Sequence, residues 1–352
     1  MLKEISPKHR AVSYIQKELK PLVRSIDMKH YYPASFLKGL GERGFFSSGD
    51  LSYEDVFLRE SQLVEDVSRV CMTTGFLVWC HLAALTYARH TTNEHIRKEL
   101  LPRLESGEIL GATGLSNPMK FYGKLEKLHL HAERVAEGYV VSGCLPAVSN
   151  VQQNGEHYFG FVAHTDTGNR IMAFAPCNST GLTMKEKRDY LGLNGSATFV
   201  CQFEAVFIPD QYVISEDADA FVSRIRPFFL LYQIPIGLGV VRATIESIHR
   251  AKKKQTGVNA YLPVQAEDIE QQYNKTKASF QTFLQSSELD WKGIAKTKLE
   301  TAYLTLQGTQ TEMLHNGGAA YLMKSDPSRR LREAYFYANL TPTIKHLEKI
   351  TH

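Results

Sequence analysis

Residues 190–209 read YLGLNGSATFVCQFEAVFIP, and this stretch decides the fold. It opens on a Gly-x-x-Gly-Ser turn formed by Gly192, Gly195 and Ser196. The residues that follow are rich in aromatic and β-branched side chains and end on Val-Phe-Ile-Pro, which is typical of a strand closed by a proline. The stretch therefore predicts the end of a β-rich segment in the middle of the chain.

The residues before this stretch also read as strands. Residues 129–143, HLHAERVAEGYVVSG, predict a hairpin around Glu137 and Gly138. YFGFVAH and RIMAFAP, separated by the turn TDTGN, predict a second pair. We expect a β domain over residues 111–217.

Helical patterns flank this β segment on both sides. Residues 75–88, GFLVWCHLAALTYA, are apolar nearly all round and predict a central buried helix, in which His81 is a core histidine. Glu60 and Glu65 are expected on the solvated surface of the preceding helix. Long helical patterns return over residues 227–254, 264–286 and 289–316. We expect helical domains over residues 1–110 and 218–352.

Composition excludes several classes of function. The 41 basic and 37 acidic residues give a net charge of +4, too weak to predict nucleic-acid binding. The five cysteines show no C-x-x-C spacing, so no metal site is expected. The longest apolar run, residues 227–241, contains Gln233 and Pro235 and is shorter than the ~20 residues that span a bilayer. The N-terminus is too charged for a signal peptide. A cytoplasmic protein without a membrane segment is predicted.

The stretch at 190–209 resembles the acyl-CoA dehydrogenase family, whose middle domain ends on a similar G-x-x-G-S…F-x-x-V-x-V-P phrase. The order helices, strands, helices is also that of the family. The resemblance implies an α+β fold with an N-terminal α-helical domain, a β-barrel-like middle domain and a C-terminal four-helix bundle. It implies FAD as cofactor, an acyl-CoA or a carrier-protein-bound acyl group as substrate, and a homodimer or homotetramer.

Two segments resemble the family's flavin-binding walls. Residues 114–118, GLSNP, are similar to its A-x-x-x-T-E-P segment, which implies flavin contacts from Leu115 and Ser116. From the residues alone, a strand-ending turn fits equally well. Residues 143–150, GCLPAVSN, are similar to G-x-K-x-W-I-T-N. This implies contacts from Val148, Ser149 and Asn150, whereas Ala147 stands where the family has an aromatic residue.

Two further segments resemble those that hold the dinucleotide. Residues 253–257, KKQTG, are similar to R-x-Q-F-G, which implies that Lys253 and Gln255 contact the pyrophosphate. Lys253 replaces an Arg and lacks its bidentate fork. Residues 315–318, HNGG, are similar to H-G-G, which implies that Gly317 and Gly318 approach the dinucleotide of a neighbouring subunit. The alternatives are the polar end of a helix and a helix stop.

The catalytic position departs from the family. Residues 329–347 resemble E-R-L-Y-R-D-A…I-Y-E-G-T-x-x-I, in which the Glu removes the α-proton, and the match places Thr341 on that Glu. A Thr cannot serve as a base near neutral pH without activation. A helix N-cap at Thr341 with Pro342 at N1 is the alternative. The first long C-terminal helix offers no carboxylate. His157 is a candidate by similarity to flavin monooxygenases on this fold.

Three functions remain open on the sequence. The first is an FAD-dependent acyl-thioester oxidoreductase that introduces an α,β double bond. The second is a reduced-flavin monooxygenase on the same fold, for which FMN suffices. The third is a non-catalytic relative that binds an acyl thioester or a partner protein.

Overall fold

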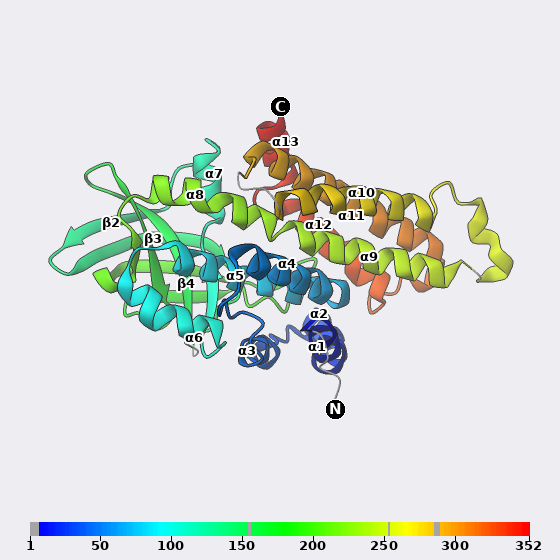
Figure 1. The fold of residues 1–352 in the computed structure, drawn as a ribbon, viewed down its shortest axis with the longest axis horizontal. Helices are drawn as coiled ribbons and strands as arrows, with labels where there is room; N and C mark the ends of the chain where they lie inside the picture. Colours follow the sequence, from blue (N-terminus) through cyan, green and yellow to red (C-terminus); the bar gives the residue numbers. More distant parts are fainter. Residues whose placement is uncertain (1–6, 154–155, 253, 285–288) are drawn as a thin grey trace.

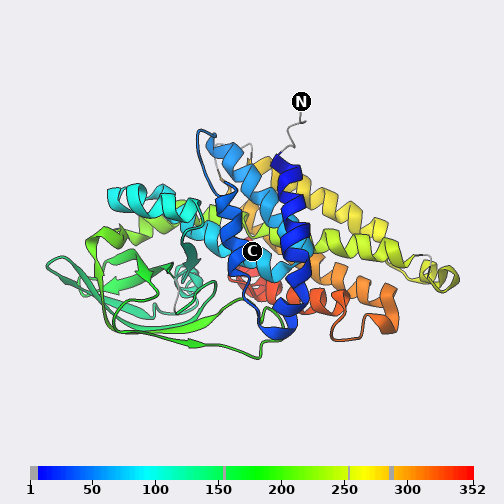
Figure 2. The same cartoon turned by 90° about the horizontal axis from the view of Figure 1, so that it is seen from below.

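The computed structural model describes residues 7–153, 156–252, 254–284 and 289–352. Figures 1 and 2 place the β-sheet at one end of the molecule and the long C-terminal helices at the other, with α4 and α5 between them. The predicted order of helices, strands and helices is therefore confirmed. The limits of the three predicted domains stay predictions.

The N-terminal part is helical. Its elements are α1 (Pro7–Tyr14), η1 (Ile15–Leu19), η2 (Lys20–Leu22), α2 (Val23–Lys29), α3 (Ala34–Glu42), α4 (Tyr53–Val70), α5 (Met72–His90), η3 (Ile96–Leu100) and α6 (Leu101–Glu105). The Ser52 side chain begins α4 by accepting a hydrogen bond from the Asp55 amide at 3.1 Å. Nearly every residue of α5 is buried, as its apolar sequence predicts.

The middle of the chain forms one sheet, in which the described residues supply eight strands. They are β1 (Leu110–Thr113), β2 (Leu130–Val135), β3 (Gly138–Val148), β4 (His157–Thr165), β5 (Arg170–Pro176), β6 (Leu182–Glu186), β7 (Phe199–Pro209) and β8 (Val213–Ser215). The order is β6-β7-β3-β2-β4-β5-β8, with β1 paired in parallel to β4. The predicted hairpin is β2–β3, in which Val135 pairs with Gly138. Between β1 and β2 lies the short helix α7 (Ser116–Tyr122).

The C-terminal part is again helical. It contains η4 (Asp210–Tyr212), α8 (Ala218–Leu231), α9 (Ile234–Ala251), η5 (Gln255–Tyr261), α10 (Ala266–Leu284), α11 (Trp291–Asn316), η6 (Gly317–Ala319), α12 (Asp326–Asn339) and α13 (Ile344–Thr351). The helices α9 to α12 pack against one another, and α4 packs against α9. The stretch Ala218–Ala251 passes a length and hydropathy test for a membrane span, but 89% of its most apolar window is buried inside the protein.

Two carboxylates expected in solvent are buried instead. Glu60 has no exposed surface and receives hydrogen bonds from Arg89 at 3.0 and 3.2 Å. Glu65 lies between α4 and α10, where it accepts from Tyr273 at 2.6 Å and pairs with Lys277 at 3.0 Å. The surface prediction was wrong for both residues, because Arg89 of α5 and Tyr232 enclose Glu60 while α10 covers Glu65. Buried carboxylates persist when they are paired.

The core histidine prediction is confirmed for His81. Its Nδ1 accepts a hydrogen bond from the Gly111 amide at 2.9 Å, and its Nε2 donates to the Leu104 carbonyl at 3.1 Å. Burial lowers the pKa of His81 to about 3, so the ring is neutral.

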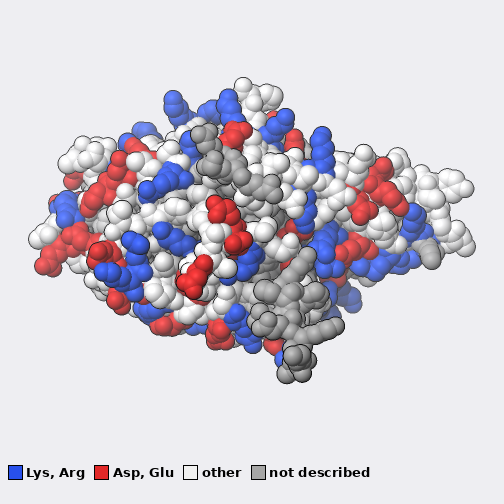
Figure 3. All heavy atoms as spheres, viewed as in Figure 1, with Lys and Arg blue, Asp and Glu red and all other residues white. Residues whose placement is uncertain are grey.

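On the surface, Figure 3 shows acidic and basic side chains intermixed over the visible face.

Candidate active site

A cavity of about 290 Å³ opens where the sheet meets α5, α8 and the end of α12. Its walls come from all three parts of the fold, so it forms only when the chain is fully folded. The residues that line it are Phe76, Trp79, Cys80, Thr113, Ser116, Ala147, Ser149, Lys187, Tyr190, Gly192, Leu193, Ser196, Thr198, Phe229, Phe336, Asn339, Leu340 and Thr341.

One side of the cavity is aromatic. The rings of Phe76 and Trp79 stack with centroids 5.5 Å apart, and Phe336 meets Phe76 edge-on at 4.9 Å. Trp79 is fixed further by a 3.0 Å hydrogen bond from its Nε1 to the Phe229 carbonyl. Such a wall is rigid and apolar and offers ring faces to a ligand.

The other side carries hydroxyl groups. Ser149 Oγ and Ser196 Oγ each lie 2.7 Å from Thr198 Oγ1. Ser149 reaches this position because it forms an isolated β-bridge with Thr113, at the end of β1. Ser116 Oγ, another hydroxyl of the lining, lies 3.1 Å from Thr341 Oγ1. A hydroxyl both donates and accepts, so this wall can bind the polar edge of a heterocycle.

The predicted flavin contacts divide into two groups. Ser116 and Ser149 line the cavity. Leu115 and Val148 have no exposed surface and are not part of the lining. Only the backbone of Leu115 has a local role, since its amide donates to Thr113 Oγ1 at 3.2 Å.

Asn150 and His157 belong to a separate buried cluster around Tyr32. Asn150 adopts a positive φ of 66°, accepts from the Tyr32 hydroxyl at 2.8 Å and donates to the Gly111 carbonyl at 2.8 Å. His157 Nε2 lies 3.4 Å from the same hydroxyl. Burial raises the pKa of Tyr32 well above its ordinary value, so its phenol is neutral. The cluster joins the segment after α2 to the sheet, and neither Asn150 nor His157 lines the cavity.

Thr341 lies in the cavity wall between α12 and α13. Its side chain faces Ser116, and its carbonyl accepts a hydrogen bond from Gln233 Nε2 at 2.9 Å. The alternative of a helix N-cap at Thr341 is wrong, because α13 begins at Ile344 and its cap is Thr343, whose hydroxyl accepts from the His346 amide.

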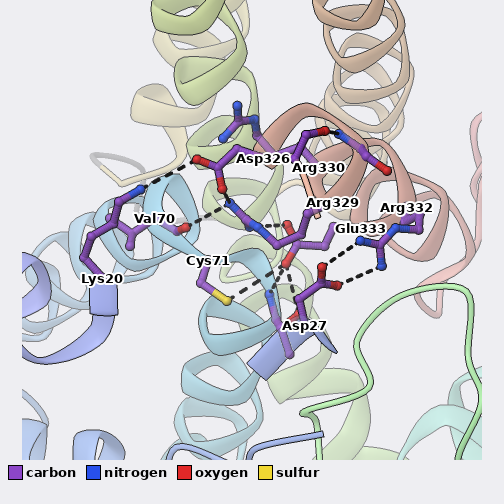
Figure 4. Close-up of polar contacts among 12 residues, drawn as sticks. Lys20, Asp27, Val70, Cys71, Asp326, Arg329, Arg330, Arg332 and Glu333 are labelled. Carbon is purple, nitrogen blue, oxygen red and sulfur yellow. Dashed lines mark hydrogen bonds and ion pairs between the residues drawn. The ribbon is translucent and has the colours of Figure 1, made fainter. Parts of the chain in front are cut away.

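Buried ion pairs hold α12, which carries the Thr341 segment (Figure 4). Glu333 accepts from the amide and the hydroxyl of Thr73, both at 3.0 Å, and from Arg329 at 2.8 Å. Arg332 pairs with Asp27 of α2 and donates to the Leu191 carbonyl at 3.2 Å. These contacts fasten α12 to α5, to α2 and to the loop before β7. The sequence interpretation missed them, although the match of Arg332 and Glu333 to the family's Arg-Asp pair was the available signal.

The cavity lacks an acid–base pair. Among its described lining residues no carboxylate occurs, and Lys187 is the one charged side chain. Burial raises the pKa of the Cys80 thiol well above its usual range, so this cysteine is a poor nucleophile. In the part of the chain that the structure describes, no group of three or more His, Cys, Asp or Glu side chains could hold a metal ion.

The described residues among the predicted dinucleotide contacts, Gln255, Gly317 and Gly318, belong to η5 and η6 at the far end of the C-terminal helices from the sheet (Figure 1). Lys253 lies outside the described residues, and Gln255 begins η5. Gly317 and Gly318 follow α11 on the surface, and a Cβ added to either would meet nothing within 4 Å. Asn259 brings the two segments together, because its side chain donates to the His315 carbonyl at 2.9 Å.

The donor set suits an isoalloxazine ring. Paired hydroxyls on one side could satisfy its polar edge, and the aromatic side could cover a flat apolar ring. Ser116 and Ser149 would hold that ring.

Comparisons with known proteins show that the chain is similar to acyl-CoA dehydrogenases. The family model for the N-terminal domain of acyl-CoA dehydrogenase matches residues 7–108. The short-chain specific acyl-CoA dehydrogenase of Bos taurus is 26% identical over 211 residues, which cover 58% of this chain and 51% of that protein. Isovaleryl-CoA dehydrogenase of Arabidopsis thaliana is 23% identical over 94% of this chain and 85% of its own length. The chain thus spans about half the length of the short-chain relatives it matches.

Solved structures show the same fold. A glutaryl-coenzyme A dehydrogenase in complex with glutaryl-CoA superposes with a TM-score of 0.87 at 17% identity, covering 100% of this chain and 95% of its own. The prolyl acyl carrier protein oxidase AnaB superposes with a TM-score of 0.83 at 14% identity, covering 98% and 96%. The predicted α+β fold with helical, β and helical parts is confirmed.

Proposed function

Because the chain belongs to the acyl-CoA dehydrogenase family, we propose that it is an FAD-dependent oxidoreductase that acts on an acyl thioester. The observation that carries this proposal is the cavity whose lining combines the hydroxyls of Ser116 and Ser149 with the aromatic rings of Phe76, Trp79 and Phe336. Bound there, the flavin would supply a two-electron acceptor for a hydride from the substrate. The acyl group would be carried by CoA or by a carrier protein, the two classes that the relatives' names contain.

The protein's own groups would bind and orient the substrate. The rings of Phe76, Trp79 and Phe336 exclude water from the apolar side, which favours an acyl chain there. The hydroxyls of Ser116 and Thr341 contact each other in the cavity lining, which would fix the position of Thr341 beside the substrate.

Removal of an α-proton has no carboxylate to perform it among the described lining residues. Thr341 stands at the family's Glu position, and its neutral hydroxyl neighbour Ser116 cannot activate it as a base. We therefore propose an atypical site in which α,β-desaturation of a simple acyl-CoA is very slow.

A reduced-flavin monooxygenase is the second candidate, since a carboxylate-free cavity suits a reaction that needs no α-proton base. FMN would then be sufficient as cofactor. His157, the residue proposed to serve that reaction, lies with Tyr32 outside the cavity wall, which removes its support. A non-catalytic acyl-thioester-binding relative is the third candidate.

The visible absorbance spectrum of the purified protein tests the proposal, together with the flavin released on denaturation. Bound FAD that is bleached anaerobically by an acyl-CoA supports the oxidoreductase. Bound FMN that is inert to acyl-CoA would favour the monooxygenase. A protein that binds acyl-CoA but no flavin would establish the non-catalytic alternative.

We also propose a cytoplasmic homodimer or homotetramer. Large apolar side chains are exposed near η5 and the end of α11, among them Tyr261 at 90% and Tyr321 at 86%. A second copy could cover them. Light scattering coupled to size-exclusion chromatography checks the assembly, and a monomer at micromolar concentration would contradict it.

A further inference from the structure

We propose that one wall of the cavity is a binding site for an anionic group and that Lys187 selects it. This donor wall consists of Lys187, Ser149, Ser196 and Thr198. The inference deepens the proposed function, because it names a charge that the ligand must carry.

Lys187 is half-buried in the wall, directly after β6. Its amide donates to the Thr198 carbonyl at 2.8 Å, which places it beside the hydroxyls. Its charged neighbours are occupied with each other, since Arg188 Nη2 pairs with Glu186 at 2.6 Å. Within the described residues, no carboxylate lies within ion-pair distance of the Lys187 ammonium.

The hydroxyls of the donor wall add a further donor. Ser149, Thr198 and Ser196 carry one hydroxyl hydrogen each, and they share two hydrogen bonds. One hydrogen is therefore left for a ligand, in a lining that also contains the Lys187 ammonium with its three N–H groups. A wall with this surplus of donors needs an acceptor from the ligand.

The apolar part of the lining makes pairing with Lys187 necessary for a bound anion. The aromatic rings of Phe76, Trp79 and Phe336 lower the local dielectric constant, so a buried negative charge is costly without a partner and its attraction to a paired ammonium is stronger than in water. With no acidic side chain among the described lining residues, an anionic oxygen would meet no repulsion there.

Two sources could supply that anion. One is a carboxylate at the far end of the acyl chain, as in a dicarboxylic acyl thioester. The other is the negative charge that a bound flavin gains on reduction. In both cases the Lys187 ammonium pairs with an anionic group, and the experiment below distinguishes the substrate carboxylate from the reduced flavin.

The test compares the parent with Lys187→Met, which keeps most of the length of the side chain and removes the charge. Calorimetry measures the binding of glutaryl-CoA and of pentanoyl-CoA, which differ at the chain terminus, to the protein as isolated. A substrate carboxylate predicts that the parent prefers glutaryl-CoA about tenfold and that Lys187→Met loses this preference. A flavin source predicts equal binding of both thioesters and a lower flavin reduction potential in Lys187→Met.

Lys187→Arg keeps the positive charge, so it should retain the parent's preference for glutaryl-CoA or the parent's flavin reduction potential, whichever Lys187→Met loses. Lys185→Met is the matched control, because Lys185 is an exposed residue of β6 outside the lining and should change neither measurement. Unchanged preference and unchanged potential in Lys187→Met would overturn the inference while leaving the proposed function intact. Failure of the proposed function shows separately, as a parent protein whose spectrum has no flavin.

Discussion

The hydroxyl oxygen of Thr341 lies 3.1 Å from that of Ser116, although 225 positions separate the two residues. Ser116 is the first residue of α7, and Thr341 lies in the segment between α12 and α13. The contact closes the cavity between the sheet and the C-terminal helices. Two neutral hydroxyls meet there, and the sequence match predicts the family's carboxylate at position 341, which is why we expect an atypical reaction.

Loss of the cavity hydroxyls should weaken flavin binding. In the double variant Ser116→Ala and Ser149→Ala, two hydrogen-bond partners of the ring edge disappear. A loss of about 2–3 kcal/mol in flavin binding is expected, since each hydrogen bond contributes roughly 1 kcal/mol. Flavin titration of the apoprotein measures it. Ser279→Ala, on the exposed face of α10, is the control. Equal flavin affinity in the double variant and the parent would show that the flavin lies elsewhere.

A base at position 341 should create a new activity. We expect Thr341→Glu to exchange the α-protons of a bound acyl-CoA with deuterium, whereas the parent exchanges them very slowly. Mass spectrometry of the recovered thioester measures the exchange. The control is Thr341→Gln, in which Gln has nearly the same volume as Glu but cannot act as a base, so this variant should stay inert. Rapid oxidation of acyl-CoA by the parent would mean that the base lies at another position.

Truncation of Glu333 should destabilise the fold. This buried carboxylate pairs with Arg329 and accepts two hydrogen bonds from Thr73. Glu333→Ala leaves Arg329 buried without that partner, which costs about 3–5 kcal/mol. Urea unfolding measures the change in the free energy of unfolding. Glu94→Ala, which removes only a surface pair with Lys98, should cost less than about 1 kcal/mol. Equal stabilities of the two variants would contradict the role of Glu333 as an anchor for α12.

His81 should make stability depend on pH. Burial lowers its pKa to about 3 in the folded state, and an unfolded histidine titrates near pH 6.5. Between these values only the unfolded chain binds the proton, so stability is complete above pH ~6.5 and falls as the pH drops towards 3.

His81→Gln keeps a donor and an acceptor but does not titrate. Its loss of stability from pH 7 to pH 5 should be smaller than that of the parent by about 2 kcal/mol. Chemical unfolding at the two pH values measures the difference. Parallel pH profiles of parent and variant would mean that His81 can be protonated without unfolding.

The sequence determined those parts of the molecule that depend on local pattern. The order of helices and strands, the β2–β3 hairpin and the buried helix α5 each follow from residues that are neighbours along the chain. The resemblance extended this to the fold and named Ser116 and Ser149 as flavin contacts. Both residues line the cavity, and their contact with a flavin stays a prediction.

The tertiary structure decided which residues meet across the chain. Glu60 and Glu65 seemed solvated because α4 alone leaves them on a polar face, and only the packing of neighbouring elements buries them against Arg89 and Lys277. Asn150 and His157 stand near the predicted flavin wall in sequence, yet both contact Tyr32 instead.

The donor wall and the Ser116–Thr341 contact also arise only from tertiary packing. Adjacent residues of an extended segment point to opposite sides, so a motif match fixes a position on the chain but not the side on which its side chain lies. Long-range partners such as Thr73 and Glu333, 260 positions apart, come together only when apolar burial has assembled the three parts. The sequence by itself therefore determined the scaffold, and the packing of the domains determined the chemistry of its cavity.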